Sequence, residues 1–150
     1  MNSYTSKYKK DHGIMFHHFH KKNFFPKSPG SISLNQLDKI IQFIGPKNII
    51  NAEEYLLRKQ SKTVKKNHFC LTFDDGLKSQ MLTLKILKKY SIKAFFFINT
   101  KFVGSKKTTP ELIRFFIYNH CKGIKNFYNI FENNCNLNVK KIIKDNKKKI

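Results

Sequence analysis

The chain has 150 residues, 40% of them hydrophobic, and its abundant Phe and Ile suffice for a core, which excludes disorder throughout. Its formal net charge is +21, from 30 Lys and Arg against 9 Asp and Glu. Almost all of this positive charge is lysine spread along the chain, with arginine only at Arg58 and Arg114. Recognition surfaces favour arginine, so the composition argues against a specific nucleic-acid partner.

The cysteines and the N-terminal segment indicate the cellular compartment in which the protein is expected. The three cysteines, Cys70, Cys121 and Cys135, are odd in number and have no Cys-x-x-Cys spacing, so they predict neither a disulfide framework nor a structural zinc site. Residues 1–11 are polar and basic, and the apolar piece at 13–19 is short and broken by histidines. Because neither a signal peptide nor a membrane span is indicated, we expect a cytoplasmic protein without a transmembrane segment.

The first predicted strand covers residues 13–20 and ends in histidines. If it belongs to a parallel sheet of an α/β protein, His17 reaches the rim where the carboxyl ends of the strands meet. Two interpretations of His17 follow: it lies near substrate or metal, or it is a structural residue that caps the strand end. His18 and His20 have less support for a functional role.

Two helices are predicted between this strand and the next. Ser33 and Gln36 have the spacing of a capping box. The helix that they begin has Leu37, Ile40, Ile41 and Ile44 on its apolar stripe, and Gly45-Pro46 ends it. A second helix starts near Asn51 and runs to about Arg58, with acidic residues in its first turn. A lysine-rich loop follows over residues 60–67.

An apolar run from His68 to Phe73 is followed by Asp74-Asp75-Gly76. The run predicts a strand, and chemistry in α/β enzymes gathers where such strands end. Adjacent carboxylates repel each other, and a divalent cation between them is a simple remedy. The alternative is a polar turn in which Asp74 or Asp75 caps the backbone amides of residues 77–79.

A helix and a second buried strand complete a βαβ unit. The helical stripe is made of Met81, Leu82, Leu84, Ile86 and Leu87. The run from Ile92 to Ile98 is almost continuously apolar, which is typical of a strand buried on both faces of a parallel sheet.

The segment from about Phe69 to Ile98 resembles the opening half of the polysaccharide deacetylases, the NodB-homology family. The resemblance rests on Leu71-Thr72-Phe73-Asp74-Asp75-Gly76, on a helix ending Leu87-Lys88-Lys89-Tyr90, and on Ile92-Lys93-Ala94-Phe95-Phe96-Phe97. Met15-Phe16-His17 is also similar to the Met-Tyr-His strand with which such enzymes often begin.

The resemblance implies a distorted (β/α) barrel and metal-dependent removal of acetyl groups from N-acetylated sugars or polysaccharides. It implies that Asp74 is the general base and that Asp75 is the carboxylate ligand of a divalent metal, of which zinc is the expected one. His17 becomes a candidate substrate-binding residue. A carboxylate just outside the metal's ligand set is suited to accept a proton from the attacking water.

The sequence departs from the family in its histidines. The family completes its metal site with two histidines spaced His-x-x-x-His on a later helical turn, whereas His120 is the one histidine after Asp75. Barrels of this class also commonly need about 200 residues or more. We therefore expect residues 1–150 to form a single, incomplete deacetylase-like domain, with an α/β fold that is the front half of the barrel.

Residues 98–150 are predicted to be a helical C-terminal insertion. One helix starts at Thr109-Pro110-Glu111, a second contains Phe127 to Phe131, and a third lies near residues 139–143. Three hypotheses remain from the sequence: a carbohydrate deacetylase that is weakly active or inactive as this chain, a non-catalytic remnant of that fold, and a basic polyanion-binding protein.

Overall fold

The computed structural model describes residues 11–63, 68–100 and 109–135, together with residues 138, 141, 142 and 144. The chain divides into two compact units, Met1–Gly104 and Ser105–Ile150. The first unit contains all of the strands among the described residues, and the second contains helices α4 and α5.

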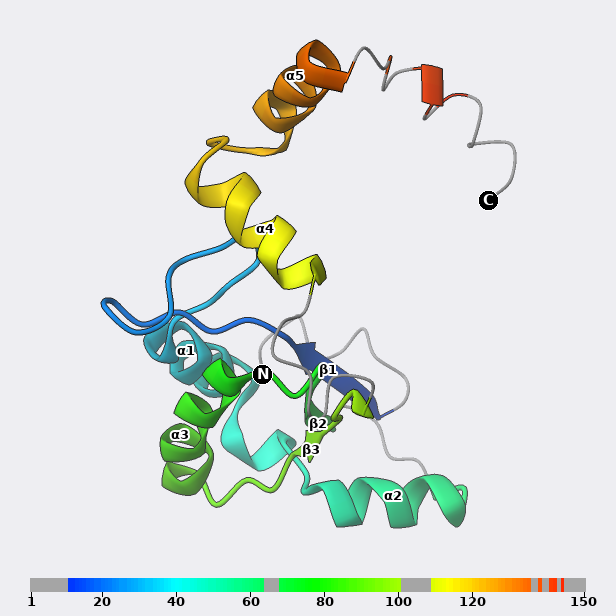
Figure 1. The fold of residues 1–150 in the computed structure, drawn as a ribbon. Coiled ribbons are helices and arrows are strands. Elements are labelled where there is room, and N and C mark those ends of the chain that lie inside the picture. Colours follow the sequence, from blue (N-terminus) through cyan, green and yellow to red (C-terminus); the bar gives the residue numbers. More distant parts are fainter. Residues whose placement is uncertain are drawn as a thin grey trace. The chain divides into compact units, whose positions relative to one another are not determined.

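The first unit is built on a parallel sheet of three strands, in the order β1-β2-β3 (Figure 1). Strand β1 is His12–Phe16, β2 is Phe69–Phe73 and β3 is Phe95–Phe96. The register pairs Phe16 with Phe73 and Phe73 with Phe96, so the three strands end together. The predicted α/β class is confirmed, whereas closure into a distorted barrel and the single-domain assignment of residues 1–150 stay predictions.

The connection from β1 to β2 contains helix α1 (Leu34–Ile44), the 3-10 helix η2 (Pro46–Asn48) and helix α2 (Ala52–Gln60). The predicted capping box is present: Ser33 Oγ accepts from the Gln36 amide at 3.2 Å, and Gln36 Oε1 accepts from the Ser33 amide at 2.8 Å. Gly45 ends α1 with a φ of 86°, a conformation that favours glycine. Both predicted helices are therefore confirmed in type and approximate extent.

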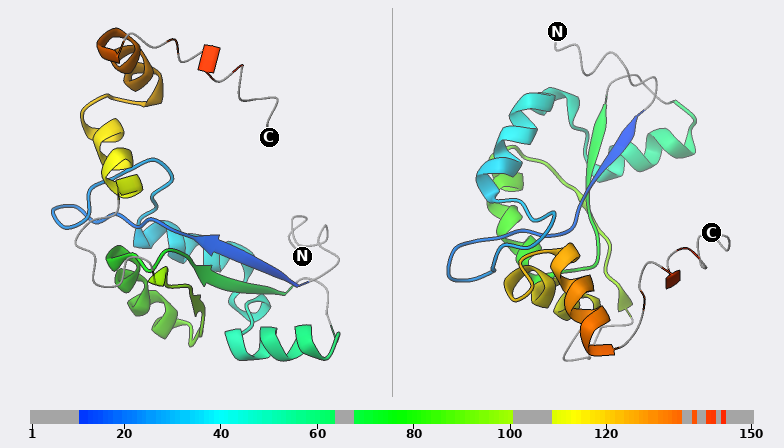
Figure 2. Two further views of the ribbon diagram at one scale, coloured as in Figure 1. Left: turned by 45° about the vertical axis from the view of Figure 1, so that its right-hand side comes forward. Right: turned by 90° about the horizontal axis from the view of Figure 1, so that it is seen from above.

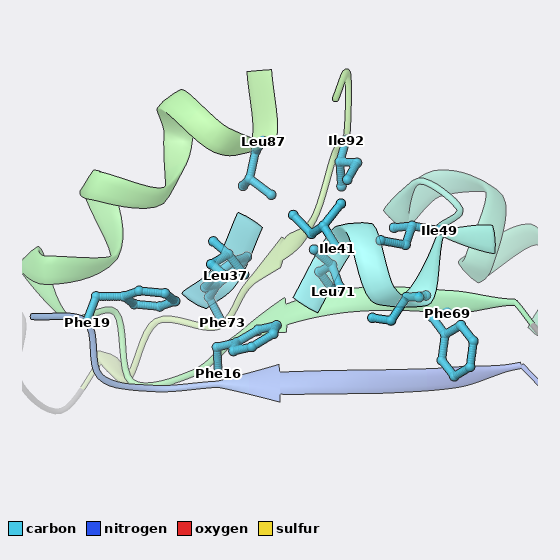
Figure 3. Packing of buried hydrophobic residues seen from close by; sticks show 11 residues of the cluster. Phe16, Phe19, Leu37, Ile41, Ile49, Phe69, Leu71, Phe73, Leu87 and Ile92 are labelled. Carbon is cyan, nitrogen blue, oxygen red and sulfur yellow. The ribbon is translucent and has the colours of Figure 1, made fainter. Parts of the chain in front are cut away.

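Helices cover both faces of the sheet. The right-hand view of Figure 2 shows α1 and α3 (Leu84–Lys89) on one side of the strands and α2 on the other. Buried side chains from α1, α3 and the sheet meet in one cluster on the α1 side (Figure 3). Its members are Phe16, Phe19, Leu37, Ile41, Ile44, Ile49, Phe69, Leu71, Phe73, Leu87 and Ile92. Cys70 is fully buried, and its burial raises the pKa of the thiol to about 11.

The connection from β2 to β3 differs from the predicted helix. It begins as the 3-10 helix η3 (Lys78–Thr83) and becomes α-helical only in α3. Met81 and Leu84, placed on the apolar stripe by the sequence, are exposed, whereas the polar Gln80 and Thr83 are buried. The Thr83 hydroxyl donates to the carbonyl oxygen of Gln80 at 2.7 Å, an i to i−3 bond that suits the tighter 3-10 turn.

The prediction of a long, doubly buried strand over Ile92–Ile98 is wrong. Strand β3 has two residues, and Phe97 and Ile98 are 51% and 66% exposed. Lys93 cannot join the ladder because its backbone is used elsewhere: its N–H donates to Asn51 Oδ1 at 2.7 Å and its carbonyl accepts from the Ala52 amide at 2.9 Å. Among the described residues no strand pairs with the outer edge of β3.

The second unit contains helix α4 (Thr109–Asn119) and helix α5 (Ile124–Cys135), where the sequence predicts two helices. The predicted third helix at 139–143 lies mostly outside the described residues. In the part of the chain that the structure describes, no helix is both long enough and apolar enough to span a bilayer.

The open edge of β3 predicts that the protein self-associates. Exposed Phe97 and Ile98 next to unpaired strand groups favour association through the edge. We expect the purified chain to bind an apolar-surface dye and to elute at a larger apparent size as its concentration rises. Phe97→Lys should reduce both effects, and Phe24→Lys, at another exposed Phe, serves as the control. A monomer without dye binding at all concentrations would contradict this expectation.

Candidate active site

The candidate site lies where β1 and β2 end. Asp74 directly follows β2 and His17 directly follows β1. The Asp74 amide donates to the Phe16 carbonyl oxygen at 2.9 Å, which is the bond that carries the pairing of the two strands to the site. The structure thus brings two of the three predicted site residues to neighbouring strand ends.

A row of three stacked aromatic rings supports these strand ends. The rings of Phe16 and Phe73 have centroids 5.6 Å apart, and those of Phe73 and Phe96 are 4.6 Å apart. The three residues are register partners on β1, β2 and β3. Because the Phe73 ring is fully buried between its neighbours, this aromatic row fixes the spacing of the strands one residue before the site.

Asp74 and His17 face each other. Asp74 Oδ2 lies 3.8 Å from His17 Nε2, and the two side chains are 40% and 36% exposed. This distance is too long for a hydrogen bond but short enough for an ion pair when the imidazole is protonated. The other oxygen, Asp74 Oδ1, accepts from the Asp75 amide at 3.0 Å. Asp74 is therefore oriented by its own turn while one oxygen stays open to solvent.

The turn at Asp75 uses two residues in the left-handed region. Asp75 has a φ of 73° and Gly76 a φ of 62°. Asp75 is half-buried, and no lysine or arginine among the described residues pairs with it or with Asp74. Helix η3 starts at Lys78 without a side-chain capping bond, and Asp74 Oδ1 accepts from the Asp75 amide instead, so the helix-cap alternative is not formed among the described residues. The ion-pair contact of His17 is with Asp74.

Gln80 is a residue at this site that the sequence did not single out. It is 2% exposed, and its Nε2 donates to the carbonyl oxygen of His17 at 3.0 Å and to that of Asp74. A glutamine within an amphipathic stretch ordinarily indicates a solvated position, so no signal in the sequence pointed to it.

The donor types at the turn suit a divalent metal, but their number is small. A half-buried carboxylate at Asp75 and an imidazole at His17 are groups that zinc accepts. No three His, Cys, Asp or Glu side chains come together as a possible metal site within the described ranges. His120 lies in the second unit just after α4, where its ring stacks on Phe116 at 5.3 Å. The described residues could contribute ligands to a metal, but they do not enclose one.

Comparison with known proteins relates part of the chain to a known family. Residues 61–122 match the family model for polysaccharide deacetylase. Over this segment, which we call the deacetylase segment, the chain is similar to that family. The deacetylase segment contains the acidic turn, η3, α3 and β3, whereas His17 lies outside it.

The fold is similar to that of a de-N-acetylase from Aggregatibacter actinomycetemcomitans, with a TM-score of 0.52 and 19% sequence identity. The similarity covers 64% of this chain and 40% of that one, so the chain spans well under half of the solved de-N-acetylase. No curated protein matches the chain. At this identity the structural likeness shows the fold alone.

Gly76 of the deacetylase segment is expected to resist substitution. A Cβ there would lie 3.2 Å from Ile98 Cγ2 and 3.3 Å from Ile98 Cα, at a φ that disfavours side chains. We expect Gly76→Ala to lower the free energy of unfolding by about 2–3 kcal/mol in urea titrations. Gly30→Ala is the matched control, because Gly30 has a φ of 75° with nothing within 4 Å of its Cβ position. Equal losses in the two variants would contradict a close approach at Ile98.

Proposed function

We propose that this chain contributes the acidic turn of a carbohydrate de-N-acetylase, which hydrolyses the acetyl amide of N-acetylated sugars or polysaccharides. In this proposal Asp74 is the general base, Asp75 is a carboxylate ligand of a divalent metal such as zinc, and His17 lies beside the substrate. The observation that carries the proposal is the half-exposed Asp74 carboxylate at the end of the central strand, within the segment matched by the deacetylase family model.

The geometry around Asp74 suits a proton acceptor. A general base needs an ionised oxygen within reach of water and a fixed orientation. The Asp75 amide orients one oxygen of Asp74, and the other has only the His17 imidazole 3.8 Å away. A carboxylate has lone pairs left over after these contacts, so Asp74 has room to take a proton from a water molecule.

The division of labour between the two carboxylates follows from the turn. Asp74 continues the line of β2, whereas the left-handed φ of Asp75 turns the chain away from the strand direction. Two adjacent acids on such a turn can therefore serve different partners. A bound divalent metal would polarise the amide carbonyl and lower the pKa of a water molecule, and Asp75 would be one of its ligands.

The described residues bring together too few ligands for this chemistry. Catalytic zinc sites use three protein ligands, and the sequence has no histidine pair after Asp75. We therefore propose that the chain alone is weakly active or inactive. The competing function is a non-catalytic module of the same fold, which the small number of grouped donors among the described residues favours.

Zinc titration by NMR tests the role of the acidic turn. We expect Zn²⁺ to shift the backbone signals of residues 74–76 with weak affinity, because one carboxylate and one imidazole make a partial site. Asp75→Asn should abolish these shifts. A variant with His18→Ala and His20→Ala should leave them unchanged, which separates the turn from adventitious binding by neighbouring histidines. Shifts confined to His18 and His20 would contradict a metal ligand at Asp75.

Acetate release tests the catalytic state of the chain. With N-acetylated sugar oligomers and added Zn²⁺ or Co²⁺, we expect no turnover above metal-only controls, because the activated water needs a complete ligand set. Turnover that Asp74→Asn abolishes would show that the chain is a working deacetylase and would refute the proposed incompleteness. The control for folding is the thermal unfolding curve of Asp74→Asn.

A further inference from the structure

We propose that Gln80 is a positioning residue that holds the His17 and Asp74 strand ends at their observed separation. Its two side-chain N–H groups bridge the carbonyl oxygens of the two residues whose side chains face each other at the candidate site. The bridge is part of the fold and does not depend on the proposed function. Its importance for metal binding rests on the proposed function.

The bridge lies where the sheet stops holding the strands. The Asp74 amide makes the last bond between β2 and β1, to the carbonyl oxygen of Phe16. Beyond it, the left-handed Asp75 and Gly76 carry the chain out of the strand direction, so the ladder cannot reach the next carbonyls. The side-chain amide of Gln80 takes the place of ladder bonds here. It donates one hydrogen bond to the carbonyl oxygen of His17, after β1, and one to that of Asp74, after β2.

The backbone of Gln80 is fixed by the 3-10 turn, and its side chain is costly to bury. The Thr83 hydroxyl donates to the Gln80 backbone carbonyl oxygen at 2.7 Å, and the Gln80 backbone N–H donates to the Leu77 carbonyl oxygen at 2.9 Å, so Gln80 keeps the Leu77 bond when the Thr83 hydroxyl is removed. Its side-chain oxygen Oε1 is buried without a hydrogen-bond partner among the described residues. A buried, unsatisfied acceptor is destabilising, and an apolar side chain of the same length would avoid it. A side-chain amide at this buried position therefore indicates that Gln80 serves to bind the two carbonyl oxygens rather than to fill the core.

Hydrogen exchange tests the bridge without any metal. In Gln80→Met, which is similar in length but has no donors, we expect exchange of the Asp74 amide to become at least roughly tenfold faster relative to amides in the middle of β2. Thr83→Val is the matched control, since it removes one buried hydrogen bond from the same 3-10 helix and leaves both strand-end carbonyls bridged. In the control the ratio should stay unchanged.

Three results would overturn the inference. They are an unchanged ratio in Gln80→Met, uniformly faster exchange along all of β2, and an equal change of the ratio in Thr83→Val. Each would make Gln80 an ordinary buried residue. Gln80→Asn, one methylene shorter, keeps the amide and should give an intermediate ratio, which keeps the test decisive if Gln80→Met folds poorly.

A second readout links the bridge to the proposed site. With Zn²⁺ alone as the probe, NMR titration should give a dissociation constant about tenfold weaker in Gln80→Met than in the original chain, as for residues that orient metal ligands. Thr83→Val should bind as the original chain does, and equal affinity in all three proteins would overturn the positioning role. If Zn²⁺ leaves residues 74–76 of the original chain unshifted, the metal part of the proposed function fails, while hydrogen exchange still decides whether Gln80 holds the strand ends.

Discussion

The stacking of Phe16, Phe73 and Phe96 is the constraint on which the rest of the first unit depends. The three rings are register partners on three parallel strands and stack on one another, with Phe73 fully buried in the middle. Because each ring immediately precedes the residue that leaves the sheet, their packing decides where His17, Asp74 and Phe97 begin. A shift of β2 by one residue would put Thr72 or Asp74 in the place of the Phe73 ring, and the second case would bury a carboxylate. The packing of these core rings therefore also determines where the site residues lie.

Much of this arrangement could be predicted from short-range patterns. The Ser33 and Gln36 capping box, the Gly45 end of α1 and the strand leading into Asp74 depend on local chemistry, and each is present. Features that depend on distant partners were not predictable. Asn51 takes the Lys93 amide out of the ladder, which shortens β3, and Gln80 is buried because two carbonyls from different strands need its donors. Periodicity reports which residues are apolar, but not which polar residue the fold requires inside.

The backbone at the candidate site is held by several contacts, but few side chains that could bind a metal lie together there. Aromatic stacking, a ladder bond and the Gln80 amide all converge on the segment from Phe73 to Gly76, although the described residues group no three metal-binding side chains. Support of this kind acts through backbone geometry and does not depend on a ligand being bound. The left-handed turn at Asp75 and Gly76 ends β2 in this fold whether or not the carboxylates perform chemistry. An enzyme and a non-catalytic remnant would share this backbone support and would differ in what the Asp74 and Asp75 side chains bind.

The two ends of the same strands differ in a way that favours the carboxyl end as the functional one. At the amino end, the Asp11 carboxylate is 1% exposed, with Arg58 and His68 nitrogens each 3.7 Å from one of its oxygens. Its charge is offset inside the protein and is closed to solvent, and such buried pairs contribute little net stability because desolvation opposes the attraction. Asp74, at the other end, is 40% exposed, and its nearest cationic partner is a histidine that can be neutral. Unlike Asp11, Asp74 can meet water and exchange a proton with it, which is the property that the proposed general base requires.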